Sequence, residues 1–545
     1  MERKHQPQPA LPDTIGAARH VGTAVALAAA LATLLLSWHR LYYGVDFTDE
    51  AFYVALPLRF ALGDIPLKDE QSLAQFAGVL VLPLVRLFLW LSGGAEGIVL
   101  FTRHLHLGFT ALVGLSVFLA VRRALHWQAA LLTACICLVF VPFNIHGLSY
   151  NTMGCGFLTA GCFLSLCARE ERPAHAWPWF LCGVSHSLAI LVYPPLAAAA
   201  LVFAVMVLFG RRPGRHRRLW SAYLGGGLAA AMVPLWLLWR AGLESLPPMA
   251  AYLASFDGQG RGMGKLADVA FGFWRDAPPL LLAAYNNGAN GTASLYMIVA
   301  IALLGGLAYP FLARHPFARD LMRWVWIPSF AGGFATAWSS SNGAANACIG
   351  MFPAALAAVV LIQLALRELP AANRLAALVL ETTALAVPLV VIVPLLEGGY
   401  ADFYGEPVQL PKLTERVAAG PFKGIRTTPE KLSFIETFAR DALPLIGPRD
   451  RILVFSDFPA GYLLAGVRPA VNSVWLPPAS ASAAHDRTPT FRYWEATGQR
   501  PDVVMLLRKS ALAGDPLVDR LRSDGEYRPF ADLGFATLLR RRAAP

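Results

Sequence analysis

Charged residues are scarce in this chain of 545 residues, making up 15% of it, whereas roughly a quarter is usual in soluble domains. Hydrophobic residues make up 56%, and the mean hydropathy is +0.49. A single soluble core does not account for this balance. Apolar stretches long enough to cross a bilayer, which takes about 20 residues, recur between Val21 and Pro394. We therefore expect a polytopic integral membrane protein.

Cysteine is also scarce and unevenly placed. All seven cysteines lie in apolar stretches and none follows residue 400, so no disulfide framework is indicated. Cys135 and Cys137 have no His or Cys partner at metal-ligand spacing, which favours core side chains over a metal site. No small-residue cleavage site follows the first apolar run, so this run is expected to be a retained signal anchor.

The net charge of +11 comes with arginines in short runs between the apolar stretches, as at Arg122-Arg123 and between Arg211 and Arg218. This placement is typical of cytoplasmic loops and not of a nucleic-acid-binding face. With the N-terminus inside, the arginine-rich loops of an eleven-span chain all fall on the cytoplasmic side. The predicted spans are residues 20–39, 98–121, 127–143, 151–168, 177–193, 195–210, 219–239, 293–313, 322–338, 345–366 and 374–396.

One further stretch, Ser72 to Gly93, is long and apolar but carries Pro83 and Arg86 near its middle. Counting it as a twelfth span would place every later arginine run outside the cell, which the charge bias opposes. We therefore predict a helix that lies along the membrane surface.

After Leu396 the composition changes to a mixed polar and apolar pattern, which indicates a soluble domain. We expect two units, residues 1–399 in the membrane and residues 400–545 as a C-terminal soluble α/β domain. Eleven crossings place this domain outside, in the periplasm of a Gram-negative source. No internal repeat of the transporter kind is present. Predicted elements are strands at Arg451 to Phe455, Val503 to Leu507 and Phe535 to Leu539, and an amphipathic helix at Pro429 to Ala442.

The first external loop concentrates carboxylates, Asp46, Asp49 and Glu50, where the chain leaves the bilayer. Thr48 can cap a helix that starts at Asp49. Acidic residues in such a position are usually solvated, and the helix dipole stabilises them in a first turn. The predicted helix would lie with an apolar face of Phe52, Leu56 and Phe60 on the membrane.

The order Asp49-Glu50-Ala51-Phe52-Tyr53, a short helix, Gly63-Asp64, a basic residue and a second interfacial helix resembles the first external loop of the C-type membrane glycosyltransferases. It is most similar to the branch of protein mannosyltransferases and the lipid A aminoarabinose transferase, glycosyltransferase family 39-like enzymes. The likeness covers roughly residues 20 to 210 and includes the helix break at Tyr193-Pro194-Pro195.

This resemblance implies a membrane all-α bundle with interfacial helices in the first external loop, and an inverting hexosyl- or pentosyltransferase that uses a polyprenyl-phosphate sugar. Asp49 matches the family's loop aspartate and is the candidate general base. Glu50 matches the acidic residue beside it, and Asp46 is a near neighbour. Lys68 lies where related transferases carry a basic residue that contacts the lipid phosphate. The alternative for Lys68 is snorkelling to headgroups.

The second external loop, Phe143 to Asn151, has no acidic residue where many relatives carry one. No cofactor is therefore expected, and assistance by a divalent cation is not supported. His146, Tyr150 and Asn151 are candidates for binding sugar hydroxyls or the phosphate, although a Gly-Leu-Ser-Tyr-Asn turn can equally cap the next helix.

The long loop from Ala241 to Gly291 is a candidate lid over the donor. It carries Arg261, a candidate donor contact, together with Asp257, Lys265 and Arg275. Asn342, in the polar turn Ser340 to Gly343, is a candidate for lining the cavity.

Three functions remain open at this point. A transporter or flippase needs ionisable residues near mid-bilayer, but the predicted spans contain almost no Asp, Glu or Lys. A non-catalytic membrane scaffold fits the composition but gives no reason for the first-loop carboxylates. The favoured function is transfer of a sugar from a polyprenyl-phosphate donor to an envelope lipid, glycan or protein at the outer face of the inner membrane. The expected partners are the lipid-linked sugar, the acceptor and membrane lipids, with no nucleic acid.

Overall fold

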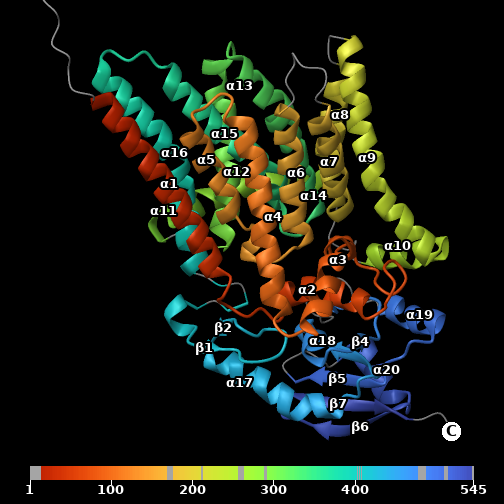
Figure 1. The fold of residues 1–545 in the computed structure, drawn as a ribbon. Helices are drawn as coiled ribbons and strands as arrows, with labels where there is room; N and C mark the ends of the chain where they lie inside the picture. Colours follow the sequence, from red (N-terminus) through yellow and green to blue (C-terminus); the bar gives the residue numbers. More distant parts are fainter. Residues whose placement is uncertain are drawn as a thin grey trace, which may run out of the picture.

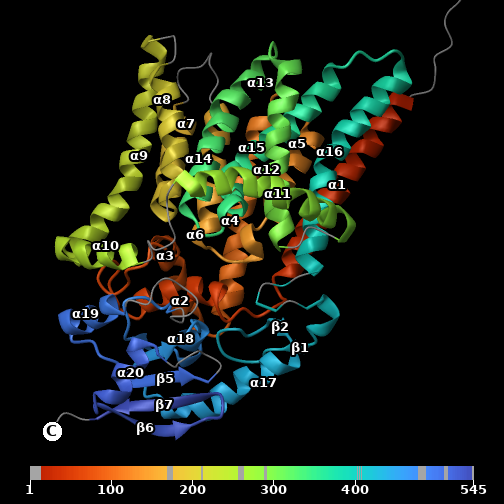
Figure 2. The same cartoon turned by 180° about the vertical axis from the view of Figure 1, so that it is seen from behind.

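The computed structural model describes residues 14–167, 176–209, 213–255, 263–287, 291–401, 403, 405–406, 408–476, 487–508 and 514–542. These residues form a helical bundle with a smaller α/β domain packed against one end of it (Figure 1). The first external loop lies at the same end, between the bundle and the C-terminal domain (Figures 1 and 2). The predicted fold class, a helical membrane bundle followed by a soluble α/β domain, is confirmed.

Each predicted span corresponds to a helix, because in lipid only a helix satisfies the backbone within its own segment. Among the described residues, seven helices are long and apolar enough to cross a membrane; six match predicted spans and the seventh is α3 (Gln75–Ser92). The count of eleven spans stays a prediction. The bundle helices are α1 (Thr14–Arg40), α4 (Ile98–Val121), α5 (Trp127–Val139), α6 (Tyr150–Leu166), α7 (Trp177–Val192), α8 (Ala197–Leu208), α9 (Pro213–Ala241), α12 (Gly291–Ala308), α14 (Ile327–Ser339), α15 (Ala347–Glu368) and α16 (Arg374–Ala401).

Helix α3 lies beside α2 (Asp49–Ala61) at the end of the bundle (Figures 1 and 2). One face of α3 is buried and the other exposes large apolar side chains, among them Trp90 and Leu91. The exposed apolar face can contact lipid, and the helix is also long enough to cross a membrane, so its location on the membrane surface stays a prediction. The two helices approach closely because Gly78 has no side chain: a Cβ there would lie 2.8 Å from the Leu56 Cβ.

The apolar face predicted for α2 is present, but it does not face lipid. Phe52, Leu56 and Phe60 are each 2% exposed or less. They pack against α3 and, at Phe52, against Trp475 of the C-terminal domain, with ring centroids 5.5 Å apart. The sequence pattern predicted the apolar face correctly, but the membrane assignment is wrong because other parts of the protein cover the helix. The C-terminal domain covers Phe52, α3 covers Leu56, and α3 together with α9 and α10 (Leu246–Ser255) covers Phe60.

The stretch from Ala241 to Gly291 is mostly helical in the described residues. It contains α10 (Leu246–Ser255) and α11 (Met263–Asn287), and α11 packs against α12, α14 and α16. The prediction of a long loop is therefore wrong for these segments, whereas their role as a lid over the donor stays a prediction. Asp257 and Arg261 lie outside the described residues.

The C-terminal domain is built on a five-stranded sheet of order β4-β3-β5-β7-β6. The strands β4, β3 and β5 are parallel, and β7 runs antiparallel to β5 and β6. The central strands β3 and β5 are almost wholly apolar because both faces are covered. The elements are β1 (Glu415–Arg416), β2 (Arg426–Thr427), α17 (Pro429–Thr437), β3 (Arg451–Phe455), α18 (Ala460–Ala465), β4 (Arg468–Pro469), α19 (Thr488–Thr497), β5 (Val503–Leu507), α20 (Pro516–Ser523), β6 (Tyr527–Asp532) and β7 (Ala536–Arg541).

The first external loop and the C-terminal domain share one hydrophobic core. The ring of Phe47 contacts Phe422, Phe434 and Phe458, with centroids 5.4–5.8 Å apart. The Ala460 N–H donates to the Phe47 carbonyl at 3.1 Å, and the Gln71 N–H donates to the Asn472 carbonyl at 2.8 Å. The soluble domain is therefore packed onto the loop and does not hang from the bundle by a linker.

The arrangement of the two ends of the bundle gives a labelling prediction. Glu96 and Glu495 lie at the end that carries the C-terminal domain, whereas Arg122 follows α4 at the other end, and all three are exposed. We expect Glu96→Cys and Glu495→Cys to react with an impermeant thiol reagent from outside, and Arg122→Cys to react only after permeabilisation. The native cysteines give little background because they are buried or half-buried. Labelling of Glu96→Cys only after permeabilisation would contradict the outer location of the loop.

Candidate active site

The start of α2 is fixed by Asp46. One oxygen of this carboxylate accepts from the N–H and the hydroxyl of Thr48, both at 2.8 Å, and the other accepts from the Glu50 N–H at 2.6 Å. Asp46 therefore caps the helix, and the prediction that Thr48 caps it is wrong. Because both oxygens of a buried carboxylate are engaged with the backbone of its own loop, Asp46 has a structural role.

Glu50 is buried and forms a two-pronged ion pair with Arg103 of α4, with two N–O distances of 2.6 Å. The same guanidinium donates to the carbonyls of Leu41 and Gly44, both at 2.6 Å. This pair ties α2 to α4 and to the end of α1. Sequence reasoning missed Arg103, although an arginine inside an apolar span is a signal because such a residue needs a partner.

Asp49, the remaining carboxylate, is half-buried beside the first turn of α6. It interacts electrostatically with the hydroxyl of Tyr150, and Tyr150 also hydrogen-bonds with Tyr53 of α2. The Tyr150 ring lies 5.7 Å from that of Tyr53 and 5.2 Å from that of Tyr193. The amide of Asn346 donates to the Tyr193 hydroxyl at 2.5 Å. The structure thus places Asp49 at one end of a row of polar side chains from four separate segments.

The second external loop provides both a cap and two polar atoms. Ser149 and Thr152 form a reciprocal cap at the start of α6, with bonds of 2.9 and 3.1 Å, so the capping interpretation is confirmed. Within the described residues, Oδ1 of Asn151 and Nε2 of His146 are buried without a hydrogen-bond partner. Burial lowers the pKa of His146 well below its ordinary value, so its imidazole is neutral. Such atoms suit binding to a substrate hydroxyl.

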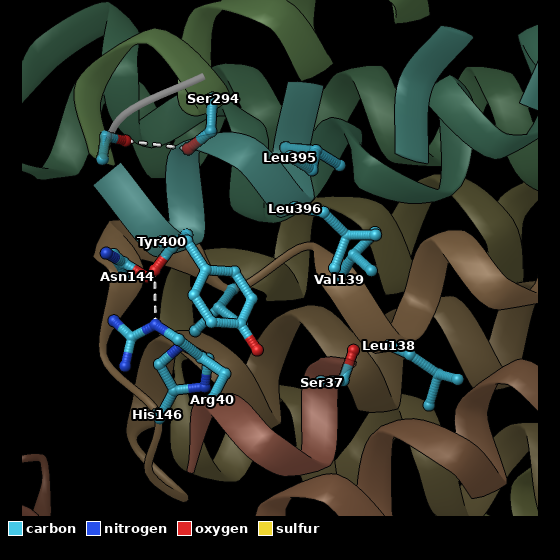
Figure 3. A pocket seen from close by; sticks show the side chains of 13 residues that line it. Ser37, Arg40, Leu138, Val139, Asn144, His146, Ser294, Leu395, Leu396 and Tyr400 are labelled. Carbon is cyan, nitrogen blue, oxygen red and sulfur yellow. Dashed lines mark hydrogen bonds between the residues drawn. The ribbon is translucent and has the colours of Figure 1, made fainter. Parts of the chain in front are cut away.

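Two small cavities bring Asp46, Glu50 and His146 together. One, of about 30 Å³, lies between α1 and α16 and is lined by Arg40, His146 and Tyr400 (Figure 3). The other, of about 10 Å³, reaches Asp46 and Glu50, and Arg40 and His146 line both. A water molecule needs about 10–15 Å³ of such volume. These cavities hold a few waters and not a sugar.

A much larger cavity, of about 420 Å³, lies beyond the end of α2. Lys68 and Gln71 of the first loop form one wall, residues around α10 form a second, and α19 forms a third. Its volume falls within the range of ligand pockets, about 300–1,000 Å³. Asp49 does not line it, so the structure does not bring Asp49 and Lys68 into one cavity. The other lining residues are Leu67, Ala241, Glu244, Ser245, Pro247, Pro248, Ala251, Pro489, Arg492, Tyr493, Ala496 and Thr497.

The last two sequence candidates lie elsewhere. Arg261 is outside the described residues. Asn342 is exposed, and its N–H donates to the Ser340 hydroxyl at 3.1 Å, just before the 3-10 turn Gly343–Asn346 that ends the polar row. Tyr53, Tyr193 and Asn346 are site residues that sequence reasoning missed, because nothing in the sequence brings them together.

No family model and no curated protein matches this chain. Several solved structures are similar to it. The Archaeoglobus fulgidus oligosaccharyltransferase, tethered with an acceptor peptide, is 12% identical over 88% of this chain and 69% of its own, with a TM-score of 0.46. ArnT from Cupriavidus metallidurans in the apo state is 14% identical over 94% and 97%, with a TM-score of 0.45. ArnT bound to undecaprenyl phosphate is 15% identical over 95% and 97%, with a TM-score of 0.42.

The buried pair of Glu50 and Arg103 gives a stability prediction. Arg103→Met should lower the free energy of unfolding by about 3–5 kcal/mol, because it leaves a buried carboxylate without its cation. Glu50→Gln should cost less, because the amide oxygen still accepts a hydrogen bond. Thermal melts of the purified protein in detergent measure both, with the exposed Arg122→Met as the control. A melting temperature of Arg103→Met equal to that of the control would contradict a structural role for this pair.

Proposed function

We propose that this protein is a glycosyltransferase that moves a sugar from a polyprenyl-phosphate donor to an envelope acceptor at the outer face of a bacterial inner membrane. The observation that most supports this proposal is that the three carboxylates at the start of α2 make different contacts. Asp46 caps α2 and Glu50 neutralises Arg103, whereas Asp49 is half-buried at the head of a polar row. A loop built only for solvation needs no such arrangement.

In the proposed reaction, a hydroxyl of the acceptor attacks the anomeric carbon and displaces the lipid phosphate with inversion. The new bond joins the anomeric carbon to the acceptor oxygen, and the bond to the phosphate oxygen breaks with its electron pair. Asp49 accepts the hydroxyl proton. We assign the binding of sugar hydroxyls beside it to the hydroxyls of Tyr53 and Tyr150 and to the amide of Asn151. The mechanism uses no cofactor.

The phosphate of the donor requires a cation and room for the lipid end of the molecule. The cavities that Arg40 lines have room for only a few waters. The cavity that Lys68 lines has the volume of a ligand site. We therefore assign the first contact with the carrier phosphate to Lys68. Because that phosphate is bonded to the anomeric carbon, transfer at Asp49 requires the donor to move from this cavity toward the start of α2.

Asp49→Asn should abolish sugar transfer while the protein still binds the carrier lipid. Asparagine keeps the size of the side chain but cannot accept the proton, and a general base typically contributes about a hundredfold to ten-thousandfold. Turnover of a radiolabelled lipid-linked sugar measures the effect, with carrier binding assayed in parallel. Glu96→Gln, which removes an exposed carboxylate of the same loop, is the control. Turnover by Asp49→Asn above about a tenth of wild type is too high for a removed base and would overturn the assignment.

Lys68→Ala should weaken use of the donor lipid more than Lys68→Arg, because either cation can face a phosphate whereas alanine leaves its charge unbalanced. The measurement is KM for the lipid-linked sugar, with thermal melts to confirm that both variants fold. Near-normal KM in both variants would favour a lysine that reaches only to lipid headgroups.

A further inference from the structure

Two cations face the large cavity from different domains. Lys68 projects from the first external loop, and Arg492 from α19 of the C-terminal domain. Both are exposed, and within the described residues neither side chain forms an ion pair or a hydrogen bond. Some arginines of the same domain are instead paired: Arg487 lies 2.7 Å from Asp515, and Arg500 lies 2.5 Å from Glu526.

The positions of these two cations are fixed by their sequence neighbours. The hydroxyl of Tyr493 donates to Gln499 Oε1 at 2.6 Å and lies 3.3 Å from the Asp69 carboxylate, which accepts from the Ile65 N–H at 2.6 Å. Because Asp69 follows Lys68 and Tyr493 follows Arg492, this contact places the two cation-bearing segments side by side. Tyr252 of α10 hydrogen-bonds with Ser473, which fastens the α10 wall of the cavity to the same domain.

The net charge of the cavity wall is opposite to that of a lipid phosphate, and part of the wall is apolar. Its charged residues are Lys68, Arg492 and Glu244, which sum to one positive charge, and a phosphate that links a sugar to a lipid carries one negative charge. The α10 wall is apolar at Pro247 and Pro248. Nearby Leu243 and Leu246 are exposed at the end of the bundle, where a lipid tail can enter.

We propose that Arg492 joins Lys68 in binding the phosphate of the polyprenyl carrier, so that the C-terminal domain completes the donor site. This inference rests on the proposed function and extends it. A guanidinium offers two parallel N–H donors to phosphate oxygens, which an ammonium cannot. The donor site is then formed only when the C-terminal domain is packed on the first external loop.

Binding of undecaprenyl phosphate to the full-length purified protein in detergent tests this inference. Arg492→Gln should raise the Kd by about tenfold or more, as expected for the loss of charged hydrogen bonds, and Arg492→Lys should recover part of that loss. Lys68→Ala should give a similar increase. The matched control is Arg522→Gln, which removes an exposed arginine on α20 away from the cavity. Thermal melts confirm that each variant is folded.

Two further probes, inorganic phosphate and phosphatidylglycerol, separate the possible sources of the phosphate group. We expect undecaprenyl phosphate to bind more tightly than either, and only its Kd to depend strongly on Arg492. A wild-type Kd in Arg492→Gln, with a raised Kd in Lys68→Ala, would overturn the role of Arg492 and leave the proposed function standing. Equal binding of phosphatidylglycerol would overturn the assignment to the carrier lipid. Failure of the wild-type protein to bind undecaprenyl phosphate would contradict the proposed function itself.

Discussion

The buried guanidinium of Arg59 is the interaction on which the half of the protein that carries the C-terminal domain depends. Arg59 is 1% exposed and lies 2.8 Å from Asp64 and 2.9 Å from Glu70. It also donates to the carbonyl of Val471 at 2.6 Å. A buried cation is tolerated only when it is paired and hydrogen-bonded, and removing one partner costs about 3–5 kcal/mol. The first external loop and the C-terminal domain must therefore fold against each other for this charge to be accommodated.

The two ends of α2 are held in different ways, and the candidate site depends on both. At the start, the Asp46 cap and the pair of Glu50 with Arg103 join the helix to the bundle. At the end, Arg59 joins it to the C-terminal domain, and Glu70 extends the connection by accepting from the Val474 N–H at 3.2 Å. Asp49 lies beside the first attachment and Lys68 beside the second, so both sites are preorganised by buried charges and not by exposed loops.

Much of the fold follows from local sequence. The strands at Arg451–Phe455 and Val503–Leu507 have the predicted bounds, because buried parallel strands are short, continuous apolar runs. The helix predicted to begin at Asp49 also begins there. The contacts of the candidate site could not be predicted from local sequence, because the residues that form them are far apart in the chain. Arg103 is 53 residues from Glu50, and Val471 is 412 residues from Arg59. Periodicity reports which face is apolar, but not what covers it.

The apolar face of α2 is a second example of what local sequence does not predict. An amphipathic helix next to a membrane span is normally assigned to the membrane surface, yet Phe52 and Leu56 are covered by the protein itself. For Phe52, the choice between lipid and protein as the apolar environment depends on where the C-terminal domain packs, and for Leu56 it depends on where α3 packs. The position of the C-terminal domain is set by the Arg59 network and by the ring contacts of Phe47, neither of which is visible in any local stretch of sequence.

The most direct test of the account is whether the purified wild-type protein, reconstituted in liposomes, cleaves a lipid-linked sugar. The measurement follows undecaprenyl phosphate released from a radiolabelled undecaprenyl-phosphate sugar, with and without an extract of envelope lipids and glycans as acceptor. The account predicts release of the carrier phosphate, coupled to label in the acceptor and dependent on its presence. Movement of the intact lipid-linked sugar across the bilayer without cleavage would contradict it.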